Sequence, residues 1–139
     1  MITNIADKPK GTMKLSDLYK NRKTDKDALI SSIEDFVKNN LKTVKHHQLR
    51  NLLDLVIWVK QSHTGLKTSV LESKTLGRVA ILKPKVAYMA AREEKLKGLR
   101  VELNEILSCK DNFKFGSDLE DLYDFASAIV AYHKLYGDK

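Results

Sequence analysis

Apolar residues recur at intervals of three and four along most of the chain, a spacing that places them on one face of an α-helix. The repeat is clear in residues 24–40, 44–61, 96–107 and 118–137, and a short helix is predicted near 66–73. No segment alternates apolar and polar residues for long enough to indicate a β-strand. The pattern therefore predicts an all-α fold, a single-domain bundle of about five helices over residues 24–139.

Polar residues and glycine mark the ends of these helices. Side chains that accept a hydrogen bond from a free backbone amide are typical of a first helical turn, and glycine is typical of a last one. On this basis helices are predicted to begin at Thr24, Thr43 and Ser117 and to end at Asn40 and Gly137. The acids of the last helix (Asp118, Glu120 and Asp121) are explained by a favourable interaction with the helix dipole.

Residues 1–23 lack a sustained repeat and contain the sequence KPKG at positions 8–11. We interpret them as a mobile basic N-terminal arm, with one short helical turn around Leu15, Leu18 and Tyr19.

The stretch ILKPKVAYMAARE, residues 81–93, combines helix-forming residues with an internal proline. Pro84 removes a backbone hydrogen bond, which predicts either a kink or a new helix that starts at the proline. Lys85 and Arg92 are seven residues apart and share a face with Tyr88, a grouping suited to phosphate and sugar contacts. Tyr88 itself is expected to pack between helices. The alternative is that Lys83 and Lys85 only make the surface soluble.

Trp58 lies on the polar face of the helix predicted over residues 44–61. It either forms part of a partner surface or packs under the N-terminal arm. Arg50 and Asp54 on the same face are four residues apart, a spacing that allows an ion pair.

Composition and charge narrow the class of protein. The chain has 139 residues, 42% of them hydrophobic, and lacks both an apolar run long enough for a membrane span and an apolar N-terminal signal. The only cysteine, Cys109, fits a reducing, cytoplasmic environment. The net charge is +7, and residues 42–110 alone carry 14 basic and 6 acidic side chains. Such a basic block is typical of a surface that binds a polyanion, although solubilising lysines give the same count.

No arrangement of residues for catalysis or for a cofactor emerges from the sequence. The four histidines and one cysteine match no metal-binding spacing, and no phosphate loop or nucleophile motif is present. His63 is expected at a loop surface, and His133 is expected as a hydrogen-bonded core residue or an interface residue. The sequence predicts a protein that is not an enzyme and holds neither metal nor cofactor.

Three motifs in a fixed order indicate a family. The sequence QLRNLLDLV at 48–56, LKPKVAYMAAR at 82–92 and AIVAYHKLYG at 128–137 together resemble the small helical subunit of the type III-A CRISPR interference complex, the Csm complex. The resemblance runs from about residue 30 to 137, and Ser127 stands where family members often have an acid. It implies a five-helix, non-catalytic, cytoplasmic subunit of antiviral defence. Such subunits stack along the complex beside other Csm subunits and contact the backbones of CRISPR RNA and target RNA.

The resemblance also suggests which residues contact RNA. It implies that Lys83, Lys85 and Arg92 face RNA, that Pro84 sets a local bend and that Tyr88 anchors the helix. Further candidates for RNA binding are Arg50, Arg78 and Lys134. Self-association is expected as well. Two other classes remain open: a helical adaptor that binds only protein, and a DNA-binding helix-turn-helix protein, although no clear recognition helix follows Gly65.

Overall fold

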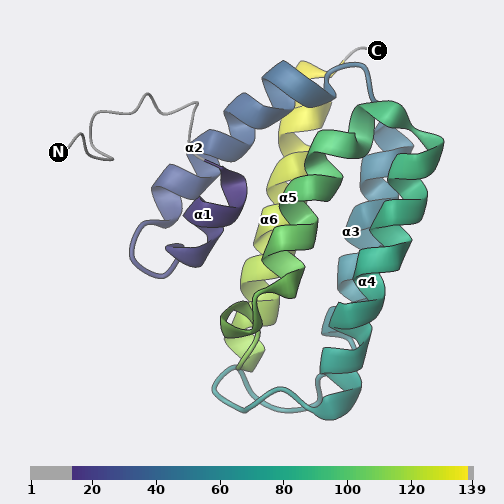
Figure 1. The fold of residues 1–139 in the computed structure, drawn as a ribbon. Helices are drawn as coiled ribbons and strands as arrows, with labels where there is room; N and C mark the ends of the chain where they lie inside the picture. The colour runs from purple at the N-terminus through teal and green to yellow at the C-terminus, as the bar shows by residue number, and fades with distance from the viewer. Residues whose placement is uncertain (1–13, 138–139) are drawn as a thin grey trace, which may run out of the picture.

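The computed structural model describes residues 14–137, and these residues form a helical bundle (Figure 1). The α-helices are α1 (Leu15–Lys20), α2 (Lys26–Phe36), α3 (His46–Lys60), α4 (Ser73–Arg92), α5 (Lys97–Ser108) and α6 (Gly116–Tyr136). A π-helical turn, Val37–Leu41, extends α2, and short 3₁₀ turns, Glu94–Leu96 and Lys110–Asn112, flank α5. In the described range the only β pairing is one isolated bridge between Val70 and Phe115. The predicted all-α class is confirmed.

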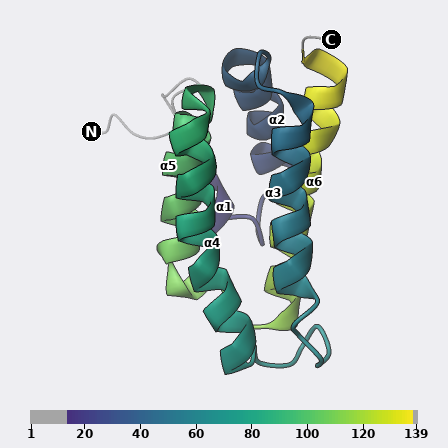
Figure 2. The same cartoon turned by 90° about the vertical axis from the view of Figure 1, so that its right-hand side faces the viewer.

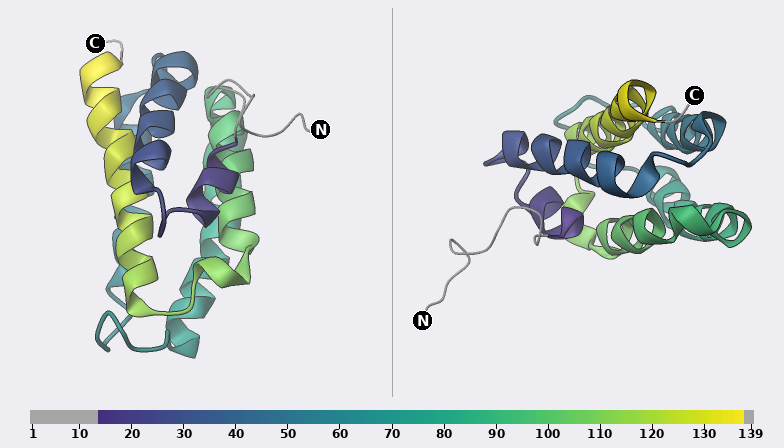
Figure 3. Two further views of the ribbon diagram at one scale, coloured as in Figure 1. Left: turned by 90° about the vertical axis from the view of Figure 1, so that its left-hand side faces the viewer. Right: turned by 90° about the horizontal axis from the view of Figure 1, so that it is seen from above.

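Two pairs of long helices form the body of the bundle. Helix α3 packs along α6, and α4 packs along α5, so that Figure 2 shows the two pairs on opposite sides of the molecule. Helices α3 and α4 are themselves neighbours. Helix α1 packs against α2 and α5, and α2 packs against α6, which closes the side of the bundle seen in Figure 3.

One continuous apolar core joins all six helices. The residues that the periodic pattern placed on the inner face of α5 are buried: Leu96, Leu99, Leu103, Ile106 and Leu107. The inner faces of α3 and α6 are likewise buried, and the most enclosed large side chains of the core include Tyr19, Leu49, Leu82, Phe125 and Ile129. Burial of apolar area of this kind is the main driving force for the fold.

The path of the chain around α4 excludes one of the two alternatives for Pro84 and one predicted helix. Helix α4 runs without interruption through Pro84, so no new helix begins at the proline. The short helix predicted near 66–73 is absent, because this segment makes backbone hydrogen bonds to the start of α6 instead. The amides of Leu71 and Gly116 donate across the two segments, at 2.9 Å each, to Lys114 and Ser69. The loop between α3 and α4 is thereby fixed to the N-terminus of α6.

The predicted helix starts are shifted by one to three residues, and the caps are different side chains. The carboxylate of Asp25, and not Thr24, accepts a hydrogen bond from the amide of Ala28 at the start of α2. Helix α3 begins at His46, later than the expected Thr43. Helix α6 begins at Gly116, one residue before the predicted Ser117.

Asp118 provides the cap of α6. One of its carboxylate oxygens, Oδ2, accepts hydrogen bonds from the amides of Lys114 at 2.8 Å and Phe115 at 2.9 Å. The predicted first residue Ser117 is therefore not the cap of α6, because the carboxylate of the next residue, Asp118, accepts the hydrogen bonds of the amides at the helix start.

Residues 14–23 of the expected arm are part of the bundle. Helix α1 confirms the predicted turn, and its Leu15, Leu18 and Tyr19 are buried in the core. The ring of Tyr19 meets that of Phe125 edge to face, with the centroids 5.6 Å apart. Residues 1–13, the rest of the expected arm, lie outside the described range.

Arg22 follows α1 and is inserted into the body of the bundle with only 3% of its side chain exposed. Its guanidinium donates at 2.7 Å both to Asp118 Oδ1 and to Asp121 Oδ2. The remaining donors meet the carbonyl of Tyr19, the side-chain oxygen of Asn112 and the carbonyl of Asn112, at 3.1–3.2 Å. An arginine side chain has five N–H donors, and all five have acceptors here. This complete set of hydrogen bonds compensates for removing the charge from water.

The two acidic partners of Arg22 are held in their ionised form. Burial would raise the pKa of the Asp118 carboxyl, but the two backbone amides at the start of α6 and the ammonium of Lys23 outweigh it and leave that pKa below its ordinary value. Burial also opposes ionisation of Asp121, and the hydrogen bonds from Arg22 and Lys23 again make the net pKa shift downward. The helix dipole alone, proposed from the sequence, is an incomplete explanation for these acids.

We expect Arg22→Ala to destabilise the protein by about 3–5 kcal/mol, because it leaves two buried carboxylates without their main partner. The free energy of unfolding in urea measures the change. Lys23→Ala is the matched control: Lys23 contacts the same carboxylates at 3.1 and 3.2 Å but is 55% exposed, so its removal should cost less than about 1 kcal/mol. Equal effects of the two substitutions would contradict a special role for Arg22.

The lowered pKa values also predict how stability depends on pH. Because the folded-state pKa of Asp118 and Asp121 is depressed, their contribution is present above the unfolded value of about 3.9 and is lost as the pH falls through the folded values. Unfolding free energies measured between pH 7 and pH 2 should therefore fall on acidification. The fall should be smaller in Asp121→Asn, and an identical fall in both proteins would exclude Asp121 as a cause.

Candidate functional site

Three of the cations singled out in the sequence lie along one flank of α4. Arg78, Lys85 and Arg92 are spaced by seven residues, close to two helical turns, so their side chains leave the helix on the side of α3. Lys85 and Arg92 are exposed, whereas Arg78 is half-buried. Lys83 leaves the helix on the other flank, where its ammonium donates to Ser108 Oγ of α5 at 3.3 Å. The structure thus separates Lys83 from Lys85, which the sequence had grouped together.

Arg78 is engaged with Trp58 of α3. Its Nη1 donates to the carbonyl oxygen of Trp58 at 2.6 Å, and its guanidinium lies 4.5 Å from the centre of the indole ring. The ammonium of Lys85 lies 5.9 Å from the same ring. Trp58 is therefore half-buried under α4 and is not a fully exposed partner surface. The alternative was that Trp58 packs under the N-terminal arm, and residues 1–13 of that arm lie outside the described range.

Tyr88 does not pack between helices, in contrast to the prediction. Its side chain is 63% exposed. Within the described chain the ring makes a cation–π contact with Arg92, whose guanidinium lies 5.8 Å from the ring centre and whose Nη1 is 3.5 Å from the hydroxyl oxygen. The reason lies in the helical repeat: Val86 and Ala90 occupy the buried face of this part of α4, and Tyr88 falls opposite them.

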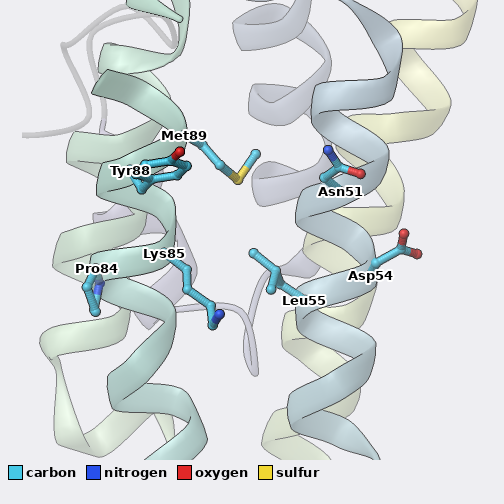
Figure 4. Close-up of a pocket in the computed structure, with 7 residues that line it drawn as sticks. All are labelled: Asn51, Asp54, Leu55, Pro84, Lys85, Tyr88 and Met89. Carbon is cyan, nitrogen blue, oxygen red and sulfur yellow. The ribbon is translucent and has the colours of Figure 1, made fainter. Parts of the chain in front are cut away.

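A groove of about 530 Å³ lies between α3 and α4 beside Tyr88. It is lined from α3 by Asn51, Asp54 and Leu55 and from α4 by Pro84, Lys85, Tyr88 and Met89 (Figure 4). The sequence pattern does not identify the α3 residues of this groove. Asn51 and Leu55 are four residues apart and share a helix face, but the pattern alone does not show that this face meets α4.

The other two candidate cations lie outside the groove. Arg50 is exposed on α3, about 100° around the helix from Asn51. The ion pair expected between Arg50 and Asp54 is not formed, although both residues are described. Lys134 is exposed in the last turn of α6, at the opposite end of the molecule from the α3–α4 loop.

A pair of histidines lies beside Lys134. His133 is buried, and its Nε2 donates to the carbonyl of Val44 at 2.8 Å. The Nδ1 atoms of His133 and His46 are 2.9 Å apart, and the two rings stack. Because Nε2 of His133 is the donor to the carbonyl, His46 donates to His133 when both rings are neutral. Of the two alternatives predicted for His133, the structure shows the hydrogen-bonded core residue.

Between residues 14 and 137 no three histidine, cysteine or acidic side chains lie close enough together to hold a metal ion. None of the helices described combines the length and the apolar character that a membrane crossing requires.

His63, expected at a loop surface, has a side chain that is only 8% exposed, with Nε2 hydrogen-bonded to the carbonyl oxygen of Leu66.

Comparison with protein families gives one result. The family model described as Csm2 Type III-A matches residues 23–139 of the chain, which includes α2 to α6 and every candidate RNA-binding residue. No curated protein and no solved structure matches the chain. The match begins directly after Arg22 and so excludes α1.

Because Tyr88 is exposed and Trp58 is half-buried, replacing them by alanine should change the stability by different amounts. We expect Tyr88→Ala to change the free energy of unfolding by about 0.5 kcal/mol or less, as is usual for exposed positions. Trp58→Ala removes a half-buried ring and the surface on which Arg78 lies, so it should cost roughly 2–3 kcal/mol, less than a fully buried aromatic side chain. Thermal unfolding of both variants provides the measurement, and a larger destabilisation by Tyr88→Ala would contradict the packing described.

Proposed function

Because the chain belongs to the Csm2 Type III-A family and is thus a subunit of the type III-A CRISPR Csm complex, we propose that it serves there as a non-catalytic small subunit. It stacks along the complex and binds the backbones of guide RNA and target RNA through a basic face. The observation that carries the proposal is the row of cations on α4, with Lys85 and Arg92 exposed on the flank toward α3.

The chemistry of this flank suits phosphate better than base recognition. Lys85 and Arg92 each present a charged donor to solvent, and neither has a carboxylate partner within ion-pair distance in the described chain. Cations that are not neutralised by neighbouring acids release counterions when they meet phosphates, which drives binding without reading sequence. Arg50, exposed on the adjacent helix α3, is a further cation without a carboxylate partner within ion-pair distance in the described chain.

The remaining candidates contribute in different ways. Arg78 is held on Trp58 and so adds positive potential from a fixed position. Lys83, on the α5 flank, and Lys134, near the C-terminal end of α6, lie on other faces. They therefore reach RNA only where it bends around the subunit or where a second strand passes.

Stacking requires a surface for neighbouring subunits, and one end of the bundle offers apolar side chains. Leu66 and Val70 of the α3–α4 loop are 74% and 71% exposed, and Phe115 beside them is 42% exposed. Exposed apolar groups gathered at one end are typical of a contact surface. They also support the second candidate function, a helical adaptor that binds only protein, so the experiment below separates the two.

We expect the triple variant Arg50→Ala, Lys85→Ala, Arg92→Ala to bind RNA more weakly than the parent while remaining folded. Removing one cation that neutralises a phosphate should reduce the slope of log affinity against log salt by about 0.7 for single-stranded RNA. Fluorescence anisotropy with labelled RNA at several salt concentrations measures both quantities. Alanine is the best helix former, so helicity should not decrease.

The control variant removes the same number of charges elsewhere. Lys20, Lys97 and Lys110 are exposed on α1, α5 and the turn after α5, and their replacement by alanine should reduce the salt slope much less. Equal reductions in the two triple variants would indicate an unspecific charge effect. RNA binding that does not respond to salt, or no RNA binding by the parent, would favour the adaptor.

A further inference from the structure

The groove between α3 and α4 has a volume and a lining that suit a small ligand. Its interior is mainly apolar, provided by Leu55, Met89 and Pro84, and its volume of about 530 Å³ lies within the range of small-molecule sites. In Figure 4, Met89 and Lys85 extend from α4 toward α3, and Leu55 extends back toward α4. The groove is open to solvent along one side, so it admits part of a larger chain.

Tyr88 forms a wall of this groove with an exposed aromatic ring. Trp58, the other aromatic residue near this flank, is covered by Arg78 at 4.5 Å. Tyr88 has no such cover, since Arg92 lies 5.8 Å from its ring centre and the side chain is 63% exposed. Exposed aromatic rings beside cations are the usual platform on which proteins stack unpaired bases, because every base has a π-face.

The polar groups around the ring match the other parts of a nucleotide. Lys85 and Arg92 are three residues before and four residues after Tyr88, so they lie on its two sides along the helix. Asn51 lies across the groove, and its amide both donates and accepts, which suits the edge of any base. Asp54, the only carboxylate of the lining, points away from α4 in Figure 4, so no acid of the lining opposes a phosphate beside Lys85 or Arg92.

We propose that this groove binds a single unstacked base of RNA. The base stacks on Tyr88, its edge meets Asn51, and the phosphates on either side meet Lys85 and Arg92. The proposal rests on the RNA-binding function and adds to it: the cations hold the backbone of paired RNA, and the groove takes a nucleotide wherever pairing is interrupted. Because the amide of Asn51 serves any base, the site recognises an unpaired base and not its identity.

The test compares three RNA duplexes of equal sequence with the full-length protein. The first is fully paired, the second carries one bulged nucleotide, and the third carries an abasic residue at the bulge. The second and third have the same phosphates and differ only by the base of the bulged residue, so a difference between them reports what the base contributes. We expect the bulged duplex to bind roughly 5- to 100-fold more tightly than the abasic one, which is the range for one stacked base.

Two variants assign the difference to Tyr88. Tyr88→Leu keeps an apolar side chain but removes the ring, and it should abolish the preference for the bulged base while binding fully paired RNA like the parent. Tyr88→Phe keeps the ring and should retain the preference. Since Tyr88 is exposed, both variants should unfold at the temperature of the parent. A third variant, Leu135→Ala, changes an exposed apolar residue on α6 (67% exposed) and should leave all three affinities unchanged.

Each result bears on one proposal or the other. If the parent binds all three duplexes equally and with the expected salt dependence, the base site is refuted and the RNA-binding function stands. The site is equally refuted if Tyr88→Leu keeps the preference for the bulged base. If Tyr88→Leu instead loses association with other Csm subunits and all three RNA affinities stay unchanged, the groove is a contact site for another protein. If the parent binds none of the duplexes, the RNA-binding function itself fails.

Discussion

The position of a single buried guanidinium determines how the N-terminal part of the chain joins the bundle. A charge removed from water is tolerated only where its hydrogen bonds are complete, and Arg22 reaches that state only when α1, the turn at Asn112 and the first turn of α6 are all in place. Asp118 extends the connection, because its second oxygen accepts the amides of Lys114 and Phe115. One ion cluster thus joins two regions that are far apart in the sequence, residues 19–23 and residues 112–121.

The same end of α6 positions the candidate site. The loop that joins α3 to α4 makes backbone hydrogen bonds to residues 114–117, which include the first residues of α6 and lie directly before Asp118. The relative placement of α3 and α4 is therefore supported at one end by this contact and along its length by Arg78 on Trp58. The groove beside Tyr88, for which we propose RNA binding, lies between these two helices, so its walls are held in place by the same contacts.

The side chains of helix α4 reach different surroundings because they leave the helix in different directions. Pro84 stays within the helix and lines the groove. Lys85 and Lys83 are two residues apart, and about 200° of helical rotation sends them to opposite flanks. Lys85 lies on the α3 side, near Trp58, and Lys83 donates a hydrogen bond to Ser108 of α5. The exposed ring of Tyr88 lies between the flanks, on the side away from the core.

The sequence by itself determined the helical class, the inner faces of the long helices and the family, because the period of apolar residues and the order of motifs are local properties that survive without coordinates. It placed Leu99 and Ile106 in the core and recognised His133 as a satisfied buried residue. It missed the burial of Arg22, the exposure of Tyr88 and the position of Asn51 in the groove opposite α4. These depend on which helices meet and at what rotation. Only the tertiary structure decides that, since a charge, a ring or an amide has the same local pattern whether or not a distant segment covers it.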